Sequence, residues 1–82
     1  MNIDAAMLEI LAEAVHNHWM TGKLRDGWKY GSVTDEAGKI HSCLVPYEQL
    51  SDANKESDRN IARSIPEILR LAGYRIVPNN KI

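Results

Sequence analysis

The sequence predicts a small α+β domain dominated by helix, in which two amphipathic helices pack together with a small β-hairpin or extended block between them. Three observations predict it. Apolar residues recur at helical spacing near each end of the 82-residue chain. Residues 27–47 lie between these segments and contain three of the five aromatic residues. A chain of this length forms one domain, with a core from about residue 5 to 77 and a loose tail over 78–82.

The first helix is expected to begin at Ala5, because the Asp4 carboxylate can accept from the free amides of the first turn. It should end before Gly27, a residue suited to the left-handed position after a helix. Gly22 lies inside and predicts local fraying or a kink, since glycine costs about 1 kcal/mol relative to alanine there. One face is apolar and should pack on the second helix: Leu8, Leu11, Ala12, Val15 and Trp19.

The central block has the two-residue period of a strand. Trp28 and Tyr30 fall on one face. Residues 35–38 are of types that favour a turn, and Gly38 can take positive φ. Residues 39–45 then predict a returning strand. Pro46 ends the pairing because proline has no N–H to donate. The block is therefore either a small hairpin or a pair of extended segments.

The second helix is expected to start near residues 57–58, after a short turn that Ser51 caps. Pro66 removes one backbone hydrogen bond and predicts a kink. Gly73 should close the helix, and residues 74–77 predict a short strand. The expected apolar face comprises Ile61, Ile65, Ile68, Leu69 and Ala72, with Leu71 at its edge.

Composition excludes several classes of partner. A formal net charge of −1 means that the chain lacks the excess of positive charge with which proteins bind the phosphates of a nucleic-acid polymer. The single cysteine cannot form an intramolecular disulfide, which fits either a reducing compartment or indifference to redox conditions. The first residues lack the basic start and apolar run of a signal peptide, and no apolar window approaches the roughly 18 residues of a membrane span. We therefore expect a cytoplasmic protein without a membrane partner, and not a channel by itself.

Residues from about position 11 to 74 carry a resemblance to a known family. They are Val15, His16, Trp19, Lys23, Gly27, Trp28, Tyr30, Gly31, Asp35, His41, residues 43–47, Leu50, residues 58–60, Leu71, Gly73 and Tyr74. In this order and at these spacings the chain resembles the ryanodine receptor (RyR) repeat domain. It departs from the family pattern at Ser42, where proline is usual, and at Pro66, which interrupts a helix usually free of proline.

The resemblance implies two helices with short strands between them. It also implies a unit that occurs in tandem pairs inside large calcium-release channels, so a single copy would rebuild such a pair as a homodimer. Copies of this domain have been linked to adenine-nucleotide binding, which raises the expectation of a nucleotide-like ligand here.

Two interpretations of the aromatic residues remain open. In one, Trp19 packs on the second helix and His16 donates to a backbone carbonyl, so both are core residues. In the other, the groove between the first helix and the central block binds a nucleotide-like molecule, with rings stacking and basic groups meeting its anion. The candidate ligand-binding residues are His16, Trp19, Lys23, Trp28, His41 and Arg59.

Neither a metal site nor catalysis is expected. His16 and His18 are two residues apart on a helix and point about 200° from each other, so they cannot bind one ion together. His41 and Cys43 lack the further ligands that a closed zinc site needs. No carboxylate or amide is placed by sequence to orient a histidine base beside Cys43, which is expected to be a small buried hydrophobe. We expect no cofactor and no enzymatic activity.

The sequence thus supports two hypotheses. The first is a non-enzymatic ligand-sensing module of RyR-domain type. The second is a structural module whose aromatic face forms a homodimer or a protein-partner interface, in which Trp19 and Trp28 are buried anchors without a small ligand.

Overall fold

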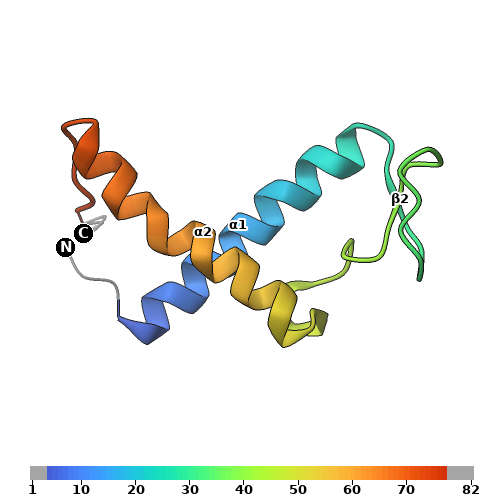
Figure 1. Cartoon of the computed structure of the whole chain (residues 1–82), viewed down its shortest axis with the longest axis horizontal. Coiled ribbons are helices and arrows are strands. Elements are labelled where there is room, and N and C mark those ends of the chain that lie inside the picture. Colours follow the sequence, from blue (N-terminus) through green and yellow to red (C-terminus); the bar gives the residue numbers. More distant parts are fainter. Residues whose placement is uncertain (1–3, 78–82) are drawn as a thin grey trace, which may run out of the picture.

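Two long helices cross near their centres and a small sheet lies beyond one end of them (Figure 1). The computed structural model describes residues 4–77, so the expected loose tail over 78–82 lies outside the described residues. In chain order the elements are α1 (Ala5–Arg25), β1 (Lys29–Tyr30), β2 (Ile40–His41), the 3-10 helix η1 (Tyr47–Gln49) and α2 (Asp52–Leu71). The predicted helix-dominated α+β class is confirmed.

The ends of α1 follow from local chemistry. The Asp4 carboxylate accepts from the Met7 amide at 2.8 Å, and this cap starts the helix as expected. At the other end, Gly27 has φ +90°, and the Trp28 amide donates to the Lys23 carbonyl at 3.0 Å. The helix runs without a break through Gly22, so the expected local fraying does not occur.

The α2 helix begins earlier than the sequence suggested. Ser51 caps the long helix itself, since its Oγ accepts from the Asn54 amide at 3.2 Å. The prediction of a start near residues 57–58 was therefore wrong: nothing between 52 and 57 breaks a helix, and the earlier cap suffices. The helix continues past Pro66 to Leu71. Gly73, with φ +91°, turns the chain away just after the helix end, as expected. Residues 74–77 form no strand, because the sheet that could pair with them lies at the far end of the molecule (Figure 1).

The two strands are parallel, which corrects the expectation of an antiparallel hairpin. Lys29 pairs with Ile40 and Tyr30 with His41. A tight turn first folds Ile40 back onto Asp35 in an isolated antiparallel bridge, and the chain then continues alongside β1 in the same direction. Only two residues of the expected returning strand, 39–45, pair in this sheet. The alternative of two extended segments is the closer description.

The turn before β2 uses its glycine for space and not for positive φ. Lys39 takes the left-handed conformation, with φ 56°, and its Nζ donates to the Asp26 carbonyl at 3.0 Å. A Cβ at Gly38 would lie 2.8 Å from the Asp35 Oδ2. A side chain at position 38 would therefore displace the Asp35 carboxylate from its place in the turn.

The core is small and centred on two alanines. Ala12 and Ala62 are fully buried and share one cluster with Tyr47 and Leu50. Small side chains let the two helix backbones approach closely where they cross. The buried face of α2 therefore passes through Ala62, and not through the expected Ile61 and Ile68, which are 50% and 59% exposed.

Candidate functional site

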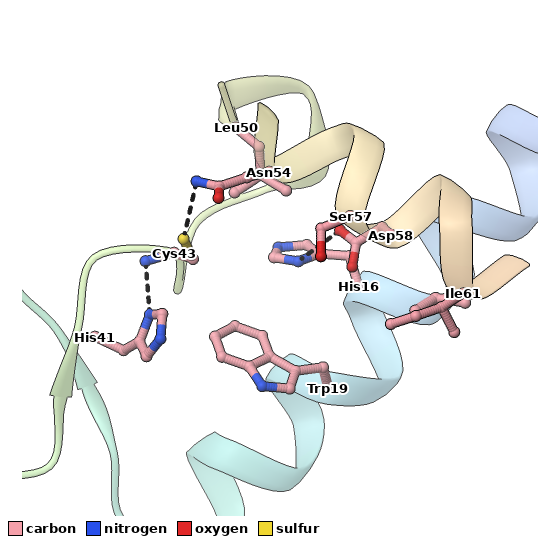
Figure 2. Close-up of a pocket in the computed structure, with 10 residues that line it drawn as sticks. His16, Trp19, His41, Cys43, Leu50, Asn54, Ser57, Asp58 and Ile61 are labelled. Atoms are coloured by element: carbon pink, nitrogen blue, oxygen red, sulfur yellow. Dashed lines mark hydrogen bonds and ion pairs between the residues drawn. The ribbon is translucent and has the colours of Figure 1, made fainter. Parts of the chain in front are cut away.

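A pocket of about 230 Å³ opens where α1, the segment after β2 and the first half of α2 meet (Figure 2). Its walls combine aromatic, apolar and polar side chains from all three. The lining residues are Val15, His16, Trp19, His41, Cys43, Leu50, Asn54, Ser57, Asp58 and Ile61. The tight turn at Asp35 and the parallel strand after it bring His41 and Cys43 to the helices, where both line the pocket.

His16 forms the inner wall and is only 2% exposed. Its Nε2 lies 2.7 Å from the Val45 carbonyl oxygen, which can only accept, so Nε2 carries the proton and donates. Its Nδ1 lies 3.6 Å from the Asp58 Oδ2 (Figure 2). The expected bond from His16 to a backbone carbonyl is confirmed, and the ring ties α1 to the segment before η1.

Trp19 lies between two histidine rings (Figure 2). Its ring is stacked with His16, with centroids 5.7 Å apart, and meets His41 edge-on with centroids 4.8 Å apart. The His41 Nδ1 accepts from the Cys43 amide at 3.0 Å, which fixes the orientation of that ring. The Trp19 ring is thus held on both sides while it lines the pocket.

Lys23 and Trp28 adjoin the pocket without lining it. The Lys23 Nζ lies 4.1 Å from the centroid of the Trp28 ring and 6.0 Å from that of Trp19. Trp28 in turn lies 6.2 Å, centroid to centroid, from His41. Five of the six candidate ligand-binding residues therefore form one continuous cluster, with a positive charge beside the Trp19 ring.

Arg59, the sixth candidate, does not line the pocket. Its guanidinium pairs with the Glu9 carboxylate through Nε and through Nη2, the latter at 3.3 Å, and lies 3.4 Å from the Glu56 Oε1. These hydrogen bonds lower the pKa of Glu9 and raise that of Arg59. Successive residues of a helix point about 100° apart, so Asp58 faces the pocket while Arg59 faces Glu9. Arg59 joins the two helices.

Sequence reasoning missed the polar residues that α2 contributes, above all Asp58. The expected start near residues 57–58 would put Asp58 at the beginning of the helix, but the early start of α2 places it in the helix interior, four residues before the buried Ala62. Burial raises the pKa of the Asp58 carboxyl, and the nearby His16 acts in the opposite direction. Asn54, at the same helical spacing, also lines the pocket. The spacing of 54, 58 and 62 was the available signal, since these positions share one helix face.

The family model described as "RyR domain" matches residues 3–78 of the 82. The chain is a member of the RyR domain family. Most of the pocket-lining residues of this RyR domain are among those that carried the resemblance: Val15, His16, Trp19, His41, Cys43, Leu50 and Asp58. The pocket is thus built largely from positions characteristic of the family pattern.

Two further features of this RyR domain concern metals and membranes. Within residues 4–77, no group of three or more histidine, cysteine or acidic side chains is placed to hold a metal ion. Among the helices of this described range, none is both long and apolar enough to cross a membrane.

Proposed function

We propose that this RyR domain is a non-enzymatic ligand-sensing module that binds a nucleotide-like molecule. A planar ring would lie in the pocket against Trp19, and an anionic group would lie near Lys23. The observation that carries the proposal is the fixed Trp19 ring on the pocket wall with the Lys23 Nζ 6.0 Å from its centroid. An aromatic face beside a cation suits a ligand that joins a heteroaromatic ring to a phosphate.

The size of the pocket limits how much of the ligand it encloses. Sites for drug-sized ligands have volumes of about 300–1,000 Å³, whereas this pocket has about 230 Å³. One ring system fits inside, and the remainder of a nucleotide would extend along the surface. Base stacking on an aromatic side chain contributes about 1–3 kcal/mol, so the ring would supply much of the affinity.

The non-enzymatic part of the proposal is supported by the way His16 is bonded. A general base needs a free nitrogen within reach of the proton that it abstracts. The His16 Nε2 donates to the Val45 carbonyl, and Nδ1 faces the Asp58 carboxylate. Nε2 is therefore occupied by the protein itself, and Nδ1 belongs to a ring that is only 2% exposed, which limits its access to a substrate. The single cysteine, Cys43, fits a reducing compartment, and we propose that the domain acts in the cytoplasm.

The proposal is tested by binding measurements on the purified chain. Mono-, di- and cyclic nucleotides are screened by thermal shift, and any hit is titrated by tryptophan fluorescence. A ligand that binds only the folded state stabilises it by about 2.7 kcal/mol at one hundred times its Kd. We expect a saturable shift that Trp19→Leu abolishes and Lys23→Gln weakens, with Tyr74→Leu as the control outside the pocket. If no nucleotide shifts the melting curve, or if a folded Trp19→Leu binds with unchanged affinity, the proposal is wrong.

A second candidate function, a homodimer or protein-partner interface, is favoured by exposed apolar side chains. Ile61, Ile68 and Leu71 of α2 are all at least half exposed. Exposed apolar groups of this size on a small domain are typical of interaction surfaces. This surface borders the aromatic face first considered, since Ile61 also lines the pocket, but it does not use Trp19 and Trp28, which are both partly buried within the chain.

A further inference from the structure

The charge inside the pocket has the opposite sign to the one expected from sequence. Among the lining residues, Asp58 is the one with a formal charge, taking histidine as neutral. Arg59, the expected cation, is paired with Glu9 and Glu56, and Lys23 lies outside the lining. The pocket is therefore acidic within and basic at its margin.

The Asp58 carboxylate has unused capacity to accept hydrogen bonds. Its side chain is 15% exposed, and the His16 Nδ1 lies 3.6 Å from its Oδ2. A carboxylate offers about four lone-pair sites. Over residues 4–77, no hydrogen bond to either Asp58 oxygen is formed. A ligand that enters the pocket removes water from this carboxylate, and removing a charge from water is unfavourable unless the charge is paired, so a donor on the ligand is favoured there.

His16 does not supply that donor when it is neutral. Its one proton is on Nε2, which donates to the Val45 carbonyl at 2.7 Å. Nδ1 then presents a lone pair toward the Asp58 oxygen, so two acceptors face each other. The remaining polar neighbours, Ser57 and Asn54, can both donate and accept and therefore do not discriminate between ligand edges.

We propose that Asp58 selects ligands whose inserted ring edge carries an amino group or another hydrogen-bond donor, over rings that lack one. The proposal rests on the proposed function, since it assumes that a planar ring enters the pocket. A ligand bound in this way lies with its donor edge toward Asp58 and its anionic end toward Lys23. Asp58 is thus a specificity-determining residue, and the two charges fix the direction in which the ligand lies.

Two matched pairs of nucleotides measure how much an amino group on the ring contributes to affinity. Adenosine 5′-monophosphate and purine riboside 5′-monophosphate differ only in the 6-amino group. Guanosine and inosine 5′-monophosphates differ only in the 2-amino group. Dissociation constants are measured by calorimetry for the unmodified chain, Asp58→Asn and Asp52→Asn. Asp52 is an exposed residue in the first turn of the same helix and serves as the control.

We expect the amino-bearing member of at least one pair to bind at least about ten-fold more tightly, since a ring without a donor would leave the carboxylate unpaired in the pocket. In Asp58→Asn this preference should fall below about three-fold, because an amide can turn either its N–H or its oxygen toward the ring. Asp52→Asn should keep the full preference.

The outcomes separate the two proposals. Binding of both pairs without a preference, or a preference that persists in Asp58→Asn, overturns the role of Asp58 and leaves the proposed function standing. If none of the four nucleotides binds, the role of Asp58 is overturned, and the proposed function falls with it only if no nucleotide of the thermal-shift screen binds either. Should Asp58→Asn fail to fold, the preference of the unmodified chain alone decides, because equal affinities within both pairs contradict the proposal.

Discussion

At the scale of single residues, the neighbours Asp58 and Arg59 take opposite roles because helix geometry turns them to different surroundings. Arg59 reaches across to Glu9 of α1, whose carboxylate also accepts from the Tyr47 hydroxyl at 3.1 Å. The Arg59 side chain is 23% exposed and that of Glu9 is 46% exposed, so this network is only partly shielded from solvent. It joins α1, η1 and α2 at one place, beside the buried cluster.

This network predicts an acid-sensitive component of stability. Arg59 holds the pKa of Glu9 below its usual value. A carboxyl whose pKa is lowered by folding stabilises the folded state above its unfolded pKa, and that stability is lost as pH falls through the folded pKa. We expect Glu9→Gln to lower Tm at neutral pH and to weaken the fall of Tm on acidification below about pH 4.5.

The matched control is Glu67→Gln. Glu67 pairs with Arg70 three residues away on the same helix and is 57% exposed, so its loss should change Tm less. Thermal melts followed by circular dichroism over a pH series compare the two variants. Equal effects of both substitutions would show that the Glu9 network adds nothing beyond a surface ion pair.

At the scale of elements, a close contact between the two short strands fixes how they lie beside each other. Gly31 follows β1, and a Cβ there would lie 2.3 Å from the Ile40 Cγ2 of β2. No real Cβ contact is that short, so either the Ile40 side chain or the two segments would have to shift. Because β2 includes His41, the position of one pocket wall depends on this glycine.

Gly31→Ala is therefore predicted to destabilise the domain by about 1–3 kcal/mol, the usual cost of overpacking. It should also weaken the binding of any ligand in the pocket, because it displaces His41.

The control is Gly22→Ala, which should change the free energy of unfolding in the opposite direction. It lies inside α1 with no neighbour of its Cβ closer than 3.8 Å, and should stabilise by about 1 kcal/mol. Urea denaturation measures both, and a neutral Gly31→Ala would contradict the close packing of Ile40.

At the scale of the whole molecule, the crossing of the helices leaves much apolar surface uncovered. The helices meet near their centres and diverge toward both ends (Figure 1). The radius of gyration is 15.0 Å, against about 12 Å expected for a compact domain of this length. Within residues 4–77, four residues form the buried cluster, and the apolar side chains packed against it are only partly buried. A domain that buries so little of its own surface gains stability from an additional partner.

We therefore predict that the chain self-associates through the exposed face of α2. Sedimentation equilibrium should show a mass that rises with concentration. Ile68→Lys, on this face, should shift the equilibrium toward monomer, whereas Ala53→Lys, exposed in the first turn of the same helix, should not. A monomer at every concentration would contradict this prediction and remove the support for a homodimer interface.

The sequence alone determined the features that depend on local chemistry. The cap at Asp4, the two left-handed glycines at 27 and 73, and the helix-dominated class were all predicted, because each depends on residues close in the chain. The family was recognised from motif spacing, and the gathering of His16, Trp19 and His41 was predicted in outline.

Only the tertiary structure decided the features that depend on contacts between distant segments. The parallel pairing of β1 with β2 follows from a turn anchored by Asp35, and the rotation of α2 places Ala62 at the crossing. The same rotation turns Asp58 into the pocket and Arg59 toward Glu9. Periodicity defines the position of an apolar face only to within about one residue, which corresponds to about 100° of rotation around the helix. A rotation of that size decides whether a side chain faces the pocket, as Asp58 does, or an ion pair, as Arg59 does.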